Sequence, residues 1–288
     1  MSEPQVHLNG RLVPASAAAI SVFDAGLLHG ASAFTTMLAH KGKVFRLDRH
    51  LKRLLETCRQ IGLRTGATEA DLAAAAEEVL RANGLAEARM RITLTPGSVK
   101  DVEAGPTTLV TAEPLAENPR EWYEKGISVV ISSLRQGTGD VISGRKTGCY
   151  LPRMLARREA AGKGAEEALW FTADGRLAEA CFCNVFLVLK GKLHTPPLDT
   201  PVLPGVVREA VIELYGPLGI ECDDQTPLTI RQMLDAEELF LTSSTAGVRP
   251  VTRVEKHAVG EEKPGPVTKR IMEAYRELLE KECGGAVA

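Results

Sequence analysis

A polar segment near the middle of the chain, residues 113–119, contains two prolines and shows no hydrophobic periodicity. Proline fixes φ and removes a backbone donor, so such a segment is typical of a boundary between folding units. The 288 residues are enough for two domains of ordinary size. We therefore expect a first domain over residues 1–115, a linker over residues 116–122 and a second domain over residues 123–288.

Short strands and helices are interspersed on both sides of this boundary. The Asn9-Gly10 pair supplies the positive φ angles of a tight hairpin turn. Apolar residues from Leu51 to Ile61 recur at helical spacing, which predicts a helix capped by Asp48 and ended by Gly62. Further helices are expected over residues 71–82, 153–161, 206–215 and 266–281, and strands over 89–94, 107–112, 127–132, 168–172, 177–180, 184–189, 192–195 and 238–242. This mixture predicts an α+β fold, not a regular βαβ winding.

Composition excludes several classes of function. With 25% charged residues, 44% hydrophobic residues and a net charge of -2, the chain has no electrostatic footprint for nucleic acid or an anionic membrane. Charged residues interrupt every apolar run, and Met1–Pro4 lacks the pattern of a secretory signal, so we expect a cytoplasmic protein. The six cysteines are scattered, which favours reduced thiols and no metal site.

The first candidate for chemistry is Lys146. The stretch Gly139–Thr147 nearly matches a phosphate-binding loop, but Arg145 displaces the lysine by one place and the next helix begins near Pro152. Nucleotide chemistry is therefore disfavoured. An amine between a Gly-rich loop and a helix could instead attack a carbonyl, although taken alone Lys146 is better explained as a solvated loop charge.

Two other features suggest what such an amine could act with. Glu179 lies in the apolar stretch 177–182, where a carboxylate usually needs a cation; a protonated pyridine nitrogen could serve, but a solvent-facing glutamate on an edge strand is equally compatible. Gly205 opens a helix whose free amides, at Val206 and Val207, could bind phosphate. The hydroxyl-rich loop 242–247 offers similar donors. The amine of Lys146, the carboxylate of Glu179 and the anion site at Gly205 together favour a pyridoxal phosphate site.

The chain resembles the class IV aminotransferases, the fold-type IV pyridoxal phosphate enzymes that include branched-chain and D-amino acid aminotransferases and aminodeoxychorismate lyase. The resemblance extends over nearly the whole sequence. It rests on residues 45–54, on Lys146 with Tyr150-Leu151, and on residues 177–179, 184–186, 195–198, 203–208, 240–246 and 265–270. It implies a small α+β N-terminal domain, a larger C-terminal pseudo-barrel domain and a homodimer with its active site near the interface.

The resemblance also implies roles for particular residues. Lys146 would form the Schiff base and shuttle the proton, Glu179 would pair with the pyridine nitrogen, and Tyr150 would reach the phenolic oxygen. The phosphate would be bound by Arg53, by the helix start at Gly205, Val206 and Val207, and by Ser244 or Thr245, while Leu203 would pack on the ring. Arg91 resembles a position that binds a substrate carboxylate, and Thr35 also falls in the substrate region.

Some residues leave the reaction open. Thr35-Thr36 follows Phe34 where branched-chain enzymes usually have Glu-Gly, and this run looks more like the lyase; residues 244–246 and 265–270 look closer to the aminotransferases. We therefore predict transamination between an amino acid and a 2-oxo acid, with 4-amino-4-deoxychorismate lyase activity as the alternative. A binding module that kept the fold and lost the chemistry is a third possibility, which the retained Lys146 and Glu179 argue against.

Overall fold

The computed structural model describes residues 3–101 and 103–284. Backbone contacts divide the chain into two compact units. Unit 1 comprises Met1–Ala116, Lys146–Cys149 and Leu279–Ala288, and unit 2 comprises Glu117–Arg145 and Tyr150–Leu278. The short segment that carries Lys146 therefore belongs with the N-terminal residues, although it lies in the second half of the sequence.

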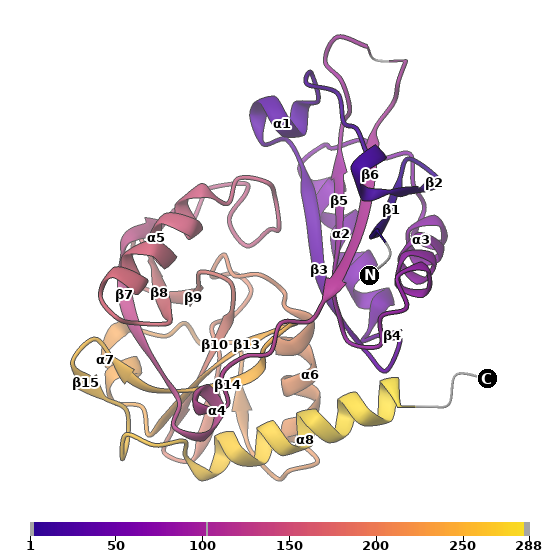
Figure 1. The fold of residues 1–288 in the computed structure, drawn as a ribbon. Coiled ribbons are helices and arrows are strands. Elements are labelled where there is room, and N and C mark those ends of the chain that lie inside the picture. Colours follow the sequence, from indigo (N-terminus) through magenta and orange to yellow (C-terminus); the bar gives the residue numbers. More distant parts are fainter. Residues whose placement is uncertain (1–2, 102, 285–288) are drawn as a thin grey trace. The chain divides into compact units, whose positions relative to one another are not determined.

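Unit 1 contains a six-stranded antiparallel sheet (Figure 1). In sheet order the strands are β2 (Arg11–Pro14), β1 (Gln5–Leu8), β6 (Thr107–Pro114), β5 (Ala88–Thr95), β3 (Ala33–His40) and β4 (Lys43–Val44). The hairpin between β1 and β2 turns at Asn9 and Gly10, both with positive φ, as the sequence predicts. Two short helical segments, η1 (Ala15–Ala17) and α1 (Ala25–His29), precede β3.

Two helices, α2 (Leu47–Gln60) and α3 (Glu69–Ala82), pack on one face of this sheet. Their apolar faces meet alternate strand residues such as Met37, Met90 and Ile92, all of which are fully buried. This alternation also decides which residues of β3 face the helices, because successive side chains of a strand point to opposite faces. Thr35 and Met37 are on the helix side, and Phe34 and Thr36 are on the other.

Unit 2 contains a nine-stranded mixed sheet that curls into a half-barrel. In sheet order its strands are β12 (Cys222–Asp223), β11 (Lys192–His194), β10 (Asn184–Leu189), β13 (Glu238–Ser243), β14 (Gly247–Val254), β7 (Ile127–Gln136), β8 (Glu167–Thr172) and β9 (Leu177–Ala180), with β15 (His257–Ala258) paired to β14. The chain turns from β9 directly into β10, where the Ala180 N–H donates to the Cys183 carbonyl at 2.7 Å. The expected α+β class is therefore confirmed, with an antiparallel N-terminal sheet and a curled second sheet.

Helices cover parts of this second sheet (Figure 1). Helix α5 (Leu151–Gly162) packs on β7 and β8, and α6 (Val206–Tyr215) packs on β13. The remaining helices are α4 (Glu121–Glu124), α7 (Ile230–Leu234) and α8 (Pro266–Cys283). No helix among the described residues is long and apolar enough to cross a membrane.

Two sequence expectations need correction. Asp48 does not cap α2: the N-cap is Arg46, which adopts a left-handed conformation. Asp48 lies in the first turn, where its negative charge interacts favourably with the helix dipole.

The sequence does not predict a strand over residues 247–254, because Pro250 and Gly247 are poor strand formers. These residues form β14 because buried partners on both β13 and β7 complete its hydrogen bonding.

We expect the packing of α2 on the sheet to dominate the stability of unit 1. Leu54 is 1% exposed within this core, so Leu54→Ala should lower the free energy of unfolding by about 2–5 kcal/mol. The exposed neighbour Lys52 provides a control, because Lys52→Ala should change it by less than about 0.5 kcal/mol. Chemical denaturation of both variants measures the difference, and equal effects would contradict this description of the core.

Candidate functional site

The backbone of Lys146 is bonded directly to β3. The Phe34 N–H donates to the Lys146 carbonyl at 2.9 Å, and the Gly148 N–H donates to the Ser32 carbonyl at 2.8 Å. Ala33 and Thr147 form an isolated antiparallel bridge between these two bonds. The lysine is thus placed by backbone hydrogen bonds to the sheet, and it is not part of a freely solvated loop.

Gly148 allows this close approach. A Cβ atom at Gly148 would lie 2.2 Å from the Ser32 hydroxyl and 2.9 Å from the Gly30 carbonyl oxygen. Both separations are shorter than van der Waals contact, and the second involves backbone, which cannot rotate away. Any larger residue would push the Lys146 segment off β3.

The Lys146 side chain lies near a phenylalanine and a second cation. Its Nζ is 5.1 Å from the centroid of the Phe34 ring, and the Arg91 guanidinium carbon is 3.7 Å from the same centroid. Arg91 is further held by donation from its Nε to the Thr93 hydroxyl at 2.9 Å. The aromatic ring contacts both cations favourably, and it keeps two positive groups in one small area.

On the helix side of β3, three polar side chains form a cluster: Thr35, His50 and Arg53. The Thr35 hydroxyl lies 2.9 Å from His50 Nδ1, and Arg53 Nη2 donates to the Thr35 hydroxyl at 3.2 Å. Arg53 Nη2 also lies 3.3 Å from His50 Nδ1. Because Thr35 is fully buried in this cluster, its side chain contacts Arg53 and does not reach the Phe34 face of the sheet.

The charge state of His50 follows from its surroundings. Burial lowers the pKa of His50 well below its usual 6.5, and the positive charges of Arg53 and Lys146 lower it further. A neutral imidazole with its proton on Nε2 has one lone pair at Nδ1, which the nearer Thr35 hydroxyl and the more distant Arg53 Nη2 share. His50 therefore helps to orient the Arg53 guanidinium as a neutral neighbour.

In unit 2, both oxygens of the Glu179 carboxylate are engaged. Glu179 is only 3% exposed, on the fully buried strand β9. Its Oε1 accepts from Arg153 Nη2 at 2.5 Å, and its Oε2 accepts from the Leu203 N–H at 3.0 Å. The cation that a buried carboxylate requires is thus supplied by the chain itself, from helix α5.

Leu203, which precedes helix α6, is held by hydrogen bonds at both its N–H and its carbonyl group. The Leu203 N–H bonds Glu179, and the Leu203 carbonyl accepts from Asn184 Nδ2 at 2.8 Å. A Cβ at Gly205 would lie 2.0 Å from Asn184 Oδ1, so only glycine fits at this N-cap. No described side chain caps the helix, which leaves the first amides, at Val206 and Val207, available to an anion.

Ser244 and Thr245 lie in the turn between β13 and β14. The turn is held by Tyr123, whose hydroxyl donates to the Ala246 carbonyl at 3.0 Å, and by Asn118, whose amide donates to the Thr245 carbonyl at 3.4 Å. Asn184, which bonds Leu203, pairs with Thr242 at the end of β13. The turn and the α6 N-terminus therefore lie at the same edge of the sheet, and the buried Thr242 hydroxyl there has no hydrogen-bond partner among the described residues.

Tyr150 is the N-cap residue of α5. Its ring stacks on Phe182, with centroids 5.8 Å apart and planes 23° apart. The Arg153 guanidinium carbon lies 5.7 Å from the Tyr150 ring centroid and 5.5 Å from that of Trp170. Tyr150 and Glu179, which the resemblance assigns to the same cofactor ring, thus share one arginine.

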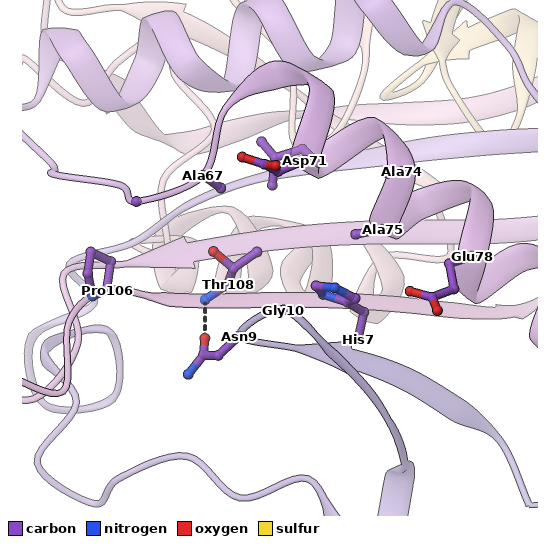
Figure 2. Close-up of a pocket in the computed structure, with 12 residues that line it drawn as sticks. His7, Asn9, Gly10, Ala67, Asp71, Ala74, Ala75, Glu78, Pro106 and Thr108 are labelled. Carbon is purple, nitrogen blue, oxygen red and sulfur yellow. Dashed lines mark hydrogen bonds between the residues drawn. The ribbon is translucent and has the colours of Figure 1, made fainter.

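A separate pocket of about 460 Å³ lies in unit 1, beside helix α3 (Figure 2). His7, Asp71 and Glu78 line it, and the Asn9 side chain accepts there from the Thr108 N–H at 2.8 Å. None of the predicted site residues borders this pocket. Among the described residues no three His, Cys, Asp or Glu side chains are grouped so that they could hold a metal ion.

Each unit taken by itself carries groups of the kind that an aldehyde cofactor with a phosphate and a ring nitrogen needs. Unit 1 has an amine at Lys146 and an arginine, Arg53, that contacts His50 and Thr35. Unit 2 supplies a buried carboxylate, an uncapped helix start where a Cβ cannot fit, and a buried hydroxyl with no partner in the described part of the chain. An amine, an anion site and an ionised acid are the groups that pyridoxal phosphate chemistry requires of a protein.

Comparison with known proteins decides the family, because residues 32–254 match amino-transferase class IV. The chain belongs to the class IV aminotransferases. The branched-chain-amino-acid aminotransferase of Escherichia coli strain K12 is 31% identical over 289 residues, covering 96% of this chain and 93% of the relative. The D-alanine aminotransferase of Bacillus licheniformis is 27% identical, covering 98% and 100%.

Solved structures of this family agree with the fold. The E. coli branched-chain amino acid aminotransferase superposes with a TM-score of 0.91 at 29% identity, covering 100% of this chain and 98% of the other. A T.th. branched-chain amino acid aminotransferase, solved with pyridoxamine 5′-phosphate, superposes with a TM-score of 0.90 at 28% identity, covering 100% and 96%. The predicted family, fold and pyridoxal phosphate-dependent transamination are confirmed.

Sequence reasoning did not single out several residues that hold the site together. They are Gly148, His50, Arg153 and Asn184. The need for a cation beside Glu179 was visible in the sequence, but nothing distinguished Arg153 from the other arginines of its helix. His50 and Gly148 carry no sequence signal of their own, because their importance comes from contacts across the fold.

We expect the neutral His50 to make the stability of unit 1 depend on pH. The pKa of His50 is lower in the folded than in the unfolded protein, so its contribution is present above about pH 6.5 and is lost as the pH falls below that value. Between pH 6.5 and 5.5 wild type should lose up to about 1 kcal/mol more than His50→Asn, which keeps an acceptor without titrating. Chemical denaturation measures the free energy of unfolding of both proteins at the two pH values. An equal decrease in both would contradict a buried neutral His50.

Gly148 should be intolerant of any side chain. We expect Gly148→Ala to displace Lys146 and to lower the rate of amino transfer by at least about tenfold, since a misplacement of about 1 Å can cost a hundredfold. Gly66→Ala is the matched control, because a Cβ at Gly66 has nothing within 4 Å. Activity assays with thermal unfolding as a check on folding make the comparison; a fully active Gly148→Ala would show that the backbone contact with β3 is dispensable.

Proposed function

We propose that Lys146 is the residue that carries the cofactor and moves the proton in the transamination, and that Glu179 pairs with the pyridine nitrogen. Arg53 binds the phosphate together with the amides of Val206 and Val207, with Ser244 or Thr245 adding a hydroxyl. Tyr150 reaches the phenolic oxygen, Leu203 packs on the ring, and Arg91 receives a substrate carboxylate. The cofactor, when bound, supplies the electron sink for the carbon whose bonds change.

One observation carries this assignment. Lys146 is held by backbone hydrogen bonds to β3, its amine lies at the Phe34 ring, and the neutral His50 holds Arg53 on the neighbouring helix. Reaction at an amine requires a fixed geometry, and phosphate binding requires an arginine that keeps its charge. All of these contacts lie within unit 1.

Thr35 was expected in the substrate region, and its hydroxyl is hydrogen-bonded to His50 and Arg53. We propose that Thr35 acts on the substrate site only through its contact with Arg53. Thr36, by contrast, lies on the Phe34 side of the sheet and pairs with Arg91 across the strands. We propose that this side of the sheet, with Phe34, Thr36 and Arg91, receives the substrate.

The relatives support an aliphatic L-amino acid as the donor. The branched-chain-amino-acid aminotransferase of Escherichia coli is 31% identical to the chain, whereas the D-alanine aminotransferase of Bacillus licheniformis is 27% identical. The T.th. enzyme has been solved with 4-methylvaleric acid, a branched monocarboxylate, and with N-(5′-phosphopyridoxyl)-L-glutamate. We propose that the chain exchanges amino groups between a branched aliphatic L-amino acid and 2-oxoglutarate.

Two further expectations accompany this function. We propose that the protein acts as a homodimer, as its family resemblance implies, and that it works in the cytoplasm, as its sequence pattern suggests. Light scattering of the purified protein tests the first of these, and a monomer that is fully active would contradict it. Fractionation of the cells that produce the protein tests the second.

We expect Lys146→Ala to abolish both amino transfer and the visible absorbance band of the lysine-bound cofactor, because no amine remains to bond the aldehyde. Lys256→Ala, at an exposed lysine of unit 2, should leave both unchanged. Absorbance spectra and activity with 2-oxoglutarate measure the effect. A Lys146→Ala protein with the wild-type band would show that another residue carries the cofactor.

A donor panel tests the substrate. Branched aliphatic L-amino acids should convert the visible band of the protein to that of the pyridoxamine form, and 2-oxoglutarate should restore it. D-alanine and D-leucine should convert it much more slowly. Failure of every L- and D-donor, with release of pyruvate from aminodeoxychorismate, would replace transamination by the lyase reaction.

A further inference from the structure

The two oxygens of Glu179 are held by groups of different kinds. The Leu203 N–H is a neutral donor on Oε2, and the Arg153 guanidinium is the charged partner on Oε1. Burying a carboxylate without a cation is costly, and here the ion pair is almost wholly out of water, with side-chain exposures of 15% for Arg153 and 4% for Glu179. Arg153 is therefore the charged partner of the Glu179 carboxylate on strand β9.

The guanidinium is fixed from several directions. Arg153 Nη1 donates to the Ala180 carbonyl at 3.1 Å and to the Cys181 carbonyl at 3.0 Å, the two residues that follow Glu179. The rings of Tyr150 and Trp170 contact its remaining surface. A planar fork with several donors can make these contacts at once, which the single point charge of a lysine cannot do.

Arg153 also joins the two residues assigned to one cofactor ring. Tyr150 lies three residues before Arg153, at the start of the same helix, and Glu179 lies on the strand that the arginine contacts. Burial opposes the charge of Arg153, but Glu179 and Tyr150 outweigh this cost and raise the pKa of Arg153 above its usual value. The guanidinium is thus a permanent charge at the place where the acid and the phenol are oriented.

We propose that Arg153 is a positioning residue of the cofactor site, which acts through Glu179 by holding its Oε1 oxygen so that the carboxylate keeps one orientation, aimed toward the pyridine nitrogen. This inference rests on the proposed role of Glu179. Without the arginine, the buried carboxylate loses its charged partner and the contact that fixes its orientation. The pyridine nitrogen then lacks a correctly placed anionic partner, as it does in Glu179→Gln.

A double-mutant cycle on the loaded protein tests the proposal. Arg153→Met should weaken pyridoxal phosphate binding by at least about tenfold and should shift the pH midpoint of the visible band in the same direction as Glu179→Gln. In the Glu179→Gln background, Arg153→Met should change the dissociation constant by less than about threefold. Arg153→Lys, which keeps the charge but loses donors, should fall between wild type and Arg153→Met.

The protein without cofactor gives a second, independent readout. Arg153→Met should lower the melting temperature by about 5–10 °C, and the same change in the Glu179→Gln background should lower it by less than about 3 °C. Arg158→Met, at an exposed arginine of the same helix, is the control and should leave both the melting temperature and the spectrum unchanged.

The outcomes separate the two proposals. If wild type shows no visible band with pyridoxal phosphate, the proposed roles of Lys146 and Glu179 fail and this inference fails with them. If wild type is loaded but Arg153→Met has equal effects in both backgrounds, only the inference is overturned. Coupling in the melting temperatures with an unchanged pH midpoint would also overturn it, because Arg153 would then support the fold alone.

Discussion

The backbone pairing of residues 146–148 with residues 32–34 is the contact on which the rest of the site depends. It adds a short extension beside β3 and places the lysine against a strand that is bonded to β5 along its whole length. The pairing is possible because Gly148 has no side chain to clash with Gly30. A lysine from the second half of the sequence thereby becomes part of the N-terminal unit.

In each of the two units, burial brings charged side chains together with specific partners. In unit 1 the positive groups Lys146 and Arg91 contact the Phe34 ring, and Arg53 contacts the uncharged His50. In unit 2 a carboxylate is buried with one arginine, and it lies beside the amide end of α6. A dianionic phosphate and a protonated ring nitrogen need these opposite environments.

Much of this organisation could be predicted from the sequence. Hairpin turns, glycine-ended helices and apolar strands predict most elements, because their causes are local. The family resemblance supplies the fold and the transamination, and both are confirmed. Strand β14 was missed because Gly247 and Pro250 interrupt its strand-forming residues, while neighbouring strands on two sides hold it in place. Arg153 and His50 were missed for a similar reason: their roles come from contacts with residues 26 and 15 positions away.

The most direct test of the account is to trap the cofactor on the protein. Borohydride reduction of the loaded protein fixes pyridoxal phosphate to the amine that carries it, and mass spectrometry of the peptides locates the label. The account predicts a single labelled peptide, with the label on Lys146. Label on another lysine, or none on a protein that transfers amino groups, would contradict it.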